Sequence, residues 1–579
     1  MLLPVLTDTK QTRDTISTFN GLCRTNECTE TEFRDVHNMS LYDYPHISTR
    51  KRRKEATLTL TNVKGILGGE TLYIVSTDKI TVIGDSITVK SSSFENSEKT
   101  LVKMGKYLCI FPDKKVFDGT TVKSMGTMSA STSVTFTLTD GKGETITYHD
   151  ATYYETHTPE DGDYLMTEVN GHAELQQYSS TSGVWTVVTT AYVMASANGI
   201  GSGLNADDGV KISLDLGSNT WDEVSSILPL EENGVHYATY PLKSVSDNAI
   251  TFSGLLSATK ALSNVTFKVE RQVPDIKYVT EANNRLWACN ASGTEIYATK
   301  LGDPFNWNCF EGISTDSWAV TVGSDGVFTG AITYLGYPTF FKENSLIKIG
   351  IASNGAHQTK ETVCRGVQNG CAKSLCVVNE ILYYKAQTAI CAYDGSLPQT
   401  ISKKLGDMSD FKKAIGGRNK ECYYVSCDGK IFVFDTLKQM WCEDDTDTYS
   451  DFTTWRNVLV GAKGNKIHLF DESSLNGTDL EYPEWYCETN TIDYQTPDTK
   501  YIHKVTVKAY MEAKSKAKVL IKYDDGNFLP LFEMKSVGTK VYPLVIIPHR
   551  CDRFTIRIEG EGNVTIHSIT KSLEVGSDL

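Results

Sequence analysis

The 579-residue chain lacks the sequence signatures of the common enzyme classes. It has no G-x-x-x-x-G-K-[ST] phosphate loop, no G-x-S-x-G nucleophile turn and no H-E-x-x-H zinc motif. The 11 histidines are scattered, without neighbours of the metal-binding type, as at His357, His468, His503, His549 and His567. We therefore expect a protein that is not an enzyme, with no catalytic, cofactor-binding or metal-binding residues and no cofactor.

Closely paired cysteines are also missing. The 14 cysteines include no C-x-x-C pair and no Cys/His spacing of the zinc type. Most lie in apolar runs such as LWACN, KYLCIF and SLCVV, where a thiol behaves as a small hydrophobic side chain. We expect free, mostly buried thiols, which fits folding in a reducing cytosol.

Long apolar runs and excess positive charge are absent as well. No window approaches roughly 18 unbroken apolar residues, so we expect no membrane span. The N-terminus MLLPVLTDTK lacks the basic and apolar segments of a secretory signal, so we expect no signal peptide. The formal net charge is −14, and because phosphate binding depends on Lys and Arg, non-specific coating of nucleic acid is not expected.

What the chain does contain is β-forming sequence. Tyr (29) and Phe (21) are plentiful, and Thr, Val and Ile recur in short runs. From Ala56 onward, runs of strand type alternate with turn signals. Groups of three or four strands begin near residues 276, 329, 373, 412 and 451, a spacing of roughly 40 to 50 that is typical of propeller blades. A parallel β-helix would show a shorter period, and a sandwich remains the other alternative.

These patterns predict an all-β fold, a β-propeller with an inserted β-domain and a C-terminal β-sandwich. The insert is rich in Ser, Thr and Gly, whereas the last hundred residues alternate cleanly between apolar and polar. The predicted parts are an extended N-terminal arm (1–55), the first propeller blades (56–120), the inserted β-domain (121–270), the remaining blades (271–479) and the sandwich (480–579).

Two charged runs stand out. The arm ends in the basic run RKRRK (50–54), which we interpret as a solvated face, with a phosphate or acidic-partner contact as the alternative. The acidic run EDDTD (443–447) lacks the spacing of a calcium loop and is interpreted as a solvated edge or turn.

One stretch is close to a sequence motif of sialidases but departs from it. SLDLGSNTW (213–221) is close to the S-x-D-x-G-x-T-W turn of sialidase propellers but is one residue too long. It also lies in the predicted insert, and arginine is sparse in the predicted blades, whereas a sialidase needs an arginine cluster for the substrate carboxylate.

The stretch LGDPFNW (301–307) combines a turn signal with two aromatic residues. Asp303 before Pro304 suits the start of a turn, because proline fixes φ and keeps the preceding residue extended. Phe305 and Trp307, two residues apart, offer apolar faces that can pack into the body on one side. With no nucleophile, base or metal partner beside it, we interpret this stretch as a structural corner.

Several longer phrases together resemble a known family. They are FNGLCRTNECTETEFRDVHNMSLYDYPHISTRKRR (19–53), MGKYLCIFPDKKVF (104–117), NNRLWACNASGTEIYATKLGDPFNWNCF (283–310), PHRCDRFTIRIEGEG (548–562) and the terminal GSDL. As a set they resemble virion proteins of tailed phages and prophages of gut bacteria, often called stabilisation or tail proteins, which are similar to podovirus tail nozzle, or tail hub, proteins. The resemblance covers nearly the whole chain and is looser over 121–270.

The resemblance implies a structural role in the phage tail. Subunits would form a homo-oligomeric, hexameric ring below the portal and adaptor, with other tail proteins or fibres below it. The ring would line the DNA exit channel without sequence-specific binding and would retain and then release the genome. Assembly would take place in the bacterial host cytoplasm.

The resemblance also suggests which residues join subunits. The arm would contact the neighbouring subunit or the adaptor, by strand-like docking. Its candidate residues are Phe19, Arg24, Tyr42, Tyr44, Pro45, Arg50, Arg52 and Arg53. The alternatives are a receptor- or glycan-binding tail protein (an adhesin), a sialidase-like glycosidase and a cellular propeller scaffold.

Overall fold

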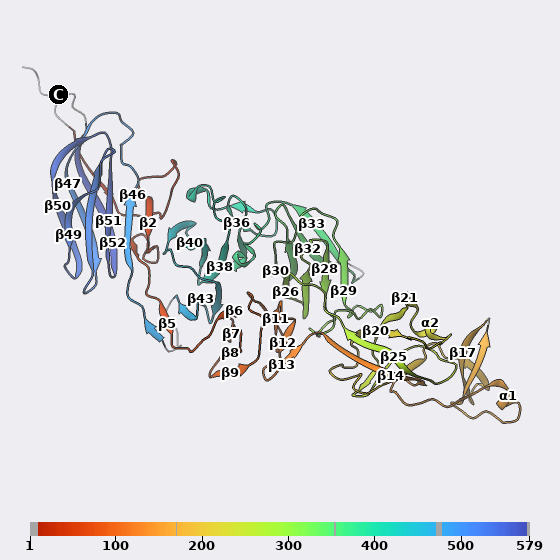
Figure 1. Ribbon diagram of the computed structural model, residues 1–579. Helices are drawn as coiled ribbons and strands as arrows, with labels where there is room; N and C mark the ends of the chain where they lie inside the picture. Colours follow the sequence, from red (N-terminus) through yellow and green to blue (C-terminus); the bar gives the residue numbers. More distant parts are fainter. Residues whose placement is uncertain (1–9, 170, 353–354, 471–476, 576–579) are drawn as a thin grey trace, which may run out of the picture. The chain divides into compact units, whose positions relative to one another are not determined.

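Figure 1 shows the computed structural model of the chain, which describes residues 10–169, 171–352, 355–470 and 477–575. The terminal GSDL phrase therefore lies outside the described residues. The chain divides into two compact units. Unit 1 comprises 1–99, 328–348 and 360–579, and unit 2 comprises 100–327 and 349–359.

The fold is an all-β propeller with an inserted β-domain and a C-terminal β-sandwich. Seven sheets of the described chain contain the four-strand antiparallel meander of a propeller blade; six of them have four strands and the seventh has five. Six of them are continuous in sequence: β6 (Val63–Leu67), β7 (Leu72–Ser76), β8 (Lys79–Ile83) and β9 (Ile87–Ser91); β10 (Thr100–Met104), β11 (Tyr107–Phe111), β12 (Lys115–Phe117) and β13 (Val122–Ser124); β26 (Tyr278–Ala282), β27 (Arg285–Cys289), β28 (Glu295–Ala298) and β29 (Trp318–Thr321); β30 (Gly330–Tyr334), β31 (Tyr337–Phe341), β32 (Ser345–Ile351) and β33 (His357–Val363); β34 (Cys376–Val378), β35 (Ile381–Lys385), β36 (Ile390–Tyr393) and β37 (Gln399–Thr400); and β38 (Ala414–Asn419), β39 (Cys422–Cys427), β40 (Lys430–Asp435) and β41 (Met440–Glu443).

The second strand of these blades is the most apolar, because neighbouring sheets cover both of its faces. Every residue of β27 and of β39 is buried. The outer strands are more exposed, and β9 is exposed along its whole length. Within unit 1, the innermost strands β34 and β38 contact each other, and so do β38 and the next blade's first strand. The helical turns η1 (Ala372–Ser374) and η2 (Lys403–Leu405) flank the β34–β37 blade.

The seventh blade is completed by the N-terminal arm. Its first three strands are β42 (Asp451–Trp455), β43 (Val458–Lys463) and β44 (Lys466–Leu469). The fourth is β5 (Lys54–Ala56), which pairs with β44 through Glu55 and His468 and on its other side with β45 (Gly477–Asp479). The strand-type sequence expected from Ala56 onward forms no strand over residues 57–62, because the pairing of β5 ends at Ala56 and the next strand begins at Val63.

The inserted domain consists of two sheets. The larger has the order β21-β22-β20-β25-β14-β19-β24-β23. Its strands are β14 (Thr127–Thr139), β19 (Tyr192–Ser196), β20 (Gly209–Asp215), β21 (Leu230–Glu232), β22 (Val235–Pro241), β23 (Ser244–Ser246), β24 (Ala249–Ser253) and β25 (Lys260–Arg271), with helix α2 (Val224–Ile227). Alternation along β14 buries Val134, Phe136 and Leu138. Val134 and Phe136 belong to the apolar cluster that also contains Phe252 and Phe267.

The smaller sheet of the insert carries few buried side chains. It contains β15 (Tyr148–His149), β16 (Tyr164–Val169), β17 (His172–Ser179) and β18 (Val184–Val187), with helix α1 (Ala151–Tyr154). Of its strand residues, only Leu165 and Leu175 are buried. We call this sheet the tip sheet.

The C-terminal sandwich takes strands from both ends of the chain. One sheet has the order β3-β4-β52-β47-β50, with β1 also paired to β52, and the other has the order β2-β46-β51-β48-β49. The arm supplies β1 (Lys10–Ile16), β2 (Phe33–His37), β3 (Met39–Ser40) and β4 (Ile47–Thr49); the C-terminal region supplies β46 (Glu484–Thr489), β47 (Lys500–Met511), β48 (Lys516–Tyr523), β49 (Leu529–Met534), β50 (Gly538–Cys551), β51 (Phe554–Glu561) and β52 (Val564–Val575).

One part of the cysteine prediction is wrong. Cys23 and Cys28 form a disulfide in the arm, because the turn between them brings their Cα atoms within 5.6 Å. The other twelve cysteines, all in the described part of the chain, are free, and ten of them are buried. Separately, no helix of the described residues combines the length and apolar character needed to cross a membrane.

Candidate functional site

The predicted assembly arm is the candidate site, and its first aromatic residue belongs to the core of unit 1. Phe19 is buried and stacks on Phe33 at 5.4 Å between ring centroids. Its backbone N–H donates to the Pro45 carbonyl at 3.0 Å, which holds two parts of the arm together. Both rings belong to the apolar cluster that includes the sandwich core. Phe19 therefore anchors the arm within its own chain.

Arg24 ties the arm to blade strand β41. Its guanidinium donates to Asp35 at 2.8 Å and to Glu443 at 2.6 Å, and lies 5.6 Å from the centroid of the Phe432 ring. Partial burial alone lowers the pKa of Arg24, but the Glu443 and Asp35 carboxylates raise it above the ordinary value. The ion pair thus stays charged and links the arm to the outer strand of a blade.

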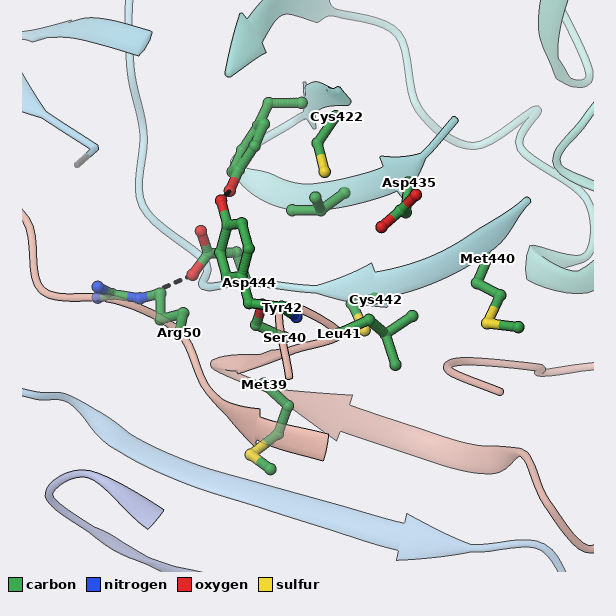
Figure 2. A pocket seen from close by; sticks show the side chains of 12 residues that line it. Met39, Ser40, Leu41, Tyr42, Arg50, Cys422, Asp435, Met440, Cys442 and Asp444 are labelled. Carbon is green, nitrogen blue, oxygen red and sulfur yellow. Dashed lines mark hydrogen bonds and ion pairs between the residues drawn. The ribbon is translucent and has the colours of Figure 1, made fainter. Parts of the chain in front are cut away.

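A small cavity marks the junction between arm and blade (Figure 2). Its volume is about 20 Å³, which is room for one water molecule and no larger ligand. Tyr42 lies on the arm side, and its hydroxyl is 3.1 Å from that of Tyr424. Figure 2 shows Arg50 directed at Asp444, with the ion pair at 2.7 Å. The junction is therefore a packed contact and not a ligand pocket.

Arg53 is the most deeply buried arginine of the junction, with 3% of its surface exposed. It donates to Asp444 at 2.9 Å, to Asp445 at 2.6 Å and to the Tyr449 hydroxyl at 3.0 Å. Its guanidinium also lies 4.1 Å from the centroid of the Phe470 ring. Burial lowers the pKa of Arg53, but the neighbouring carboxylates outweigh burial and raise the pKa above the ordinary value.

The interpretation of the two charged runs as solvated faces is therefore wrong for Arg50 and Arg53 and for Glu443, Asp444 and Asp445. Arg50 and Arg53 from the basic run face Asp444 and Asp445 from the acidic run, and Arg24 faces Glu443. Glu443 and Asp444 are buried because the arm covers them. Opposite charges in the two runs were the signal that could have paired them. The alternative of an acidic partner holds, with that partner lying in the same chain.

Three of the predicted arm residues stay accessible. Tyr44 is 40% exposed, and Pro45 next to it is also exposed, after a cis peptide bond. Arg52 is exposed and lies 4.3 Å from the centroid of the Tyr482 ring. Of the eight candidate residues, these three offer surface to another molecule, whereas Phe19, Arg24, Tyr42, Arg50 and Arg53 serve contacts within the chain.

We expect His468 to contribute to the acid sensitivity of unit 1. It is buried on β44, with Nδ1 2.9 Å from the Tyr449 hydroxyl and Nε2 3.6 Å from a Glu55 oxygen. Burial and then the charges of Arg53 and Lys463 lower its pKa below 6.5. The folded state therefore holds His468 neutral, and its contribution to stability is complete above about pH 6.5 and is lost as the pH falls.

We expect the free energy of unfolding of the wild-type chain to fall more steeply between pH 7 and pH 5 than that of His468→Gln. The excess slope cannot exceed the titration of one proton, about 1.4 kcal/mol per pH unit. Chemical denaturation at several pH values measures both slopes. Parallel curves for the two chains would show that His468 does not contribute.

The predicted corner lies in unit 2, in the loop between β28 and β29. Asp303 accepts the Phe305 backbone N–H at 2.9 Å, and burial raises the pKa of Asp303. Pro304 and Trp307 are buried, and Phe305 is half-buried against Tyr107 at 5.9 Å between centroids. The loop lies within one blade, because β29 pairs with β28 after it.

The corner also contacts the inserted β-domain, which the sequence did not predict. Asn306, which is fully buried, donates to the Asp207 carbonyl at 2.5 Å and accepts the Gly209 N–H at 3.1 Å. Arg271, at the end of β25, forms a buried ion pair with Asp208 at 2.6 Å and lies 5.3 Å from the Phe305 centroid. The only sequence signal was the conjunction of Asp-Asp-Gly before one strand and Arg at the end of another.

No protein-family model and no curated protein matches the chain. The chain is similar to the structure of PorZ, a surface component of the type-IX secretion system of Porphyromonas gingivalis, with 10% identity and a TM-score of 0.26 over 89% of this chain and 81% of that chain. It is also similar to an exo-beta-1,3-galactanase from Phanerochaete chrysosporium, with 7% identity and a TM-score of 0.20 over 52% of this chain and 97% of that chain. A third similar structure is a glycoside hydrolase family 43 arabinoxylan arabinofuranohydrolase from Bacillus subtilis, with 9% identity and a TM-score of 0.18 over 72% of this chain and 96% of that chain.

Two of these three structures are glycoside hydrolases, and this finding overturns the expectation that the chain is not an enzyme. The absence of common sequence motifs does not show whether a protein with such a fold is an enzyme, because catalytic groups lie on loops that the fold positions. At these identities and TM-scores, no residue role is transferred from the matches to this chain. The chain is a β-propeller protein.

Proposed function

We propose that the chain is a structural protein of a phage tail, whose copies form a hexameric ring around the DNA exit channel below the portal and adaptor. The observation that supports this most directly is the arm. Residues 19–53 carry one of the longest phrases of the family resemblance, and they are built into both the sandwich and the blades of unit 1. A subunit tied together from both chain ends suits a part that retains a pressurised genome.

The accessible part of the arm gives this proposal its contact surface. Tyr44, Pro45 and Arg52 would contact the neighbouring subunit or the adaptor, while the buried arginines keep the arm in place. A closed ring requires such a contact to be heterologous, with different surfaces on the two subunits. The net charge of −14 disfavours tight binding of DNA, which suits a channel through which DNA slides.

Mass spectrometry of purified virions tests the proposal directly. We expect the chain to be a component present in several copies per particle, and negative-stain images of the chain bound to portal complexes should show a ring with a central hole. Tyr44→Ala combined with Arg52→Ala should weaken ring formation with only a small change in the unfolding midpoint. Absence of the chain from virions would contradict the proposal.

The tip sheet favours a second candidate, glycan binding by a receptor-binding tail protein. Tyr154, Tyr178 and Trp185 lie on one face, with the Trp185 ring 4.9 Å and 5.3 Å from the other two. All three are half-exposed, and aromatic faces of this kind can stack on sugar rings. A glycan array with the full chain should show signals that Trp185→Ala removes and Val184→Ala, on the opposite face, retains. Equal signals for both variants would rule out this face.

A further inference from the structure

The loop between β28 and β29 brings together three side chains with metal-binding atoms. Cys309, Glu311 and Asp316 each offer one such atom, and these atoms all lie within 4.8 Å of one another. Cys309 is fully buried, and Asp316 is only 8% exposed, whereas Glu311 lies at the surface. The group therefore has a closed inner side and an open outer side.

Asp316 has one satisfied oxygen and one that has no partner. Its Oδ2 accepts the backbone N–H groups of Glu311, Gly312 and Ile313 at 2.6, 2.7 and 3.1 Å. These bonds wrap the loop around the carboxylate. Its Oδ1 is buried without a hydrogen-bond partner. A buried carboxylate oxygen left unpaired costs free energy, so this atom indicates a missing ligand.

The spacing between thiol and carboxylate fits an ion of zinc size. The Cys309 sulfur lies 3.9 Å from Glu311 Oε2. Zinc bonds of about 2.3 Å to sulfur and about 2.0 Å to oxygen, at a tetrahedral angle, place the two atoms about 3.5 Å apart. A movement of a few tenths of an ångström would therefore seat the ion between them. The other Glu311 oxygen pairs with Lys243 at 2.8 Å and leaves Oε2 available.

We propose that Cys309, Glu311 and Asp316 bind a divalent cation of the zinc type, with water in the fourth position. A thiolate ligand favours zinc over calcium or magnesium, which take oxygen ligands. A divalent cation would offset two of the three negative charges that these ligands carry.

The ion would fix the loop on which the insert rests. Arg285 already holds this loop from inside the blade, donating to the Ser314 carbonyl at 2.7 Å and to the Asp316 carbonyl. On the other side, the backbone of Gly209 approaches the Asn308 carbonyl so closely that a Cβ atom there would lie 2.3 Å from the oxygen. A bound cation would therefore stiffen the loop against which the inserted β-domain packs.

Cobalt substitution tests the site on the full chain. After removal of bound metal by a chelator, Co²⁺ should produce a thiolate charge-transfer band that saturates at one ion per chain, and equilibrium dialysis should find one Zn²⁺. Cys309→Ser should abolish the band, and Asp316→Asn and Glu311→Gln should each weaken Zn²⁺ binding by at least tenfold. Glu311→Gln alters a surface side chain, so it tests the site even if Asp316→Asn fails to fold.

Cys364→Ser is the matched control, because it removes a partly exposed thiol that is not in the loop. It should keep both the cobalt band and the zinc stoichiometry. The proposal is overturned if the wild-type chain gives no thiolate band, if Cys309→Ser keeps it, or if Cys364→Ser removes it.

Discussion

Replacing Arg53 with methionine is expected to lower the free energy of unfolding of unit 1 by about 3–5 kcal/mol. The substitution keeps an apolar side chain of similar length but removes the charge that faces Asp444 and Asp445. Asp444 is itself buried, so its carboxylate would keep only the Arg50 ion pair. Breaking a buried pair costs more than the pair contributes, because one charge remains without compensation.

The measurement is denaturant unfolding followed by a signal of unit 1, with Arg52→Met as the matched control. Arg52 is adjacent in sequence but exposed, and its contact with the Tyr482 ring should be worth about 1 kcal/mol or less. Adding Asp445→Asn to Arg53→Met should recover part of the loss, because Asp444 then still pairs with Arg50 and the carboxylate of Asp445, left without Arg53, is removed. Equal losses for the Arg52 and Arg53 variants would mean that the buried network does not stabilise the junction.

The propeller could be predicted from sequence because its inner strands are buried on both faces. Such strands read as continuous apolar runs, as in CYYVSC (422–427) and RLWAC (285–289). They recur with the period of a blade, and turns such as Asp428-Gly429 separate them. The repeat and the burial pattern are local properties, so a single sequence carries them.

The place of the arm could not be predicted, because its structure depends on partners far along the chain. β5 has three residues and no strand pattern, and it becomes a strand only between β44 and β45. The basic run 50–54 stands out in the sequence, but its acidic partner lies almost 400 residues away along the chain. Charge alone does not say whether a run is solvated or paired.

The proposed cation site was missed for a related reason. Cys309, Glu311 and Asp316 follow no known ligand spacing, and their proximity arises from the turn that the Asp316 carboxylate makes with three backbone N–H groups. Sequence reasoning did recognise the aromatic corner that precedes this turn. It could not place the insert on that corner, since the contact joins residues about a hundred positions apart.

Deleting residues 1–53 is expected to unfold much of unit 1, which is a larger effect than any single substitution. The deletion removes β1 to β4 from the sandwich, together with the arginines of the junction. It also removes seven buried apolar side chains of the shared core: Ile16, Phe19, Leu22, Phe33, Val36, Met39 and Ile47. At about 1.5–3 kcal/mol each, their loss exceeds about 10 kcal/mol, which is comparable to the whole stability of a typical domain.

Limited proteolysis and hydrogen exchange would measure this effect, with deletion of residues 1–9, which precede β1, as the control. We expect rapid cleavage and loss of protection across the sandwich strands in the longer deletion only. If that chain instead kept native protection, the arm would be dispensable for folding. Because the deletion disrupts folding, failure of the truncated chain to form rings would not show that the arm contacts a neighbour. Only substitutions at the exposed Tyr44 and Arg52, which leave the core intact, can separate assembly from folding.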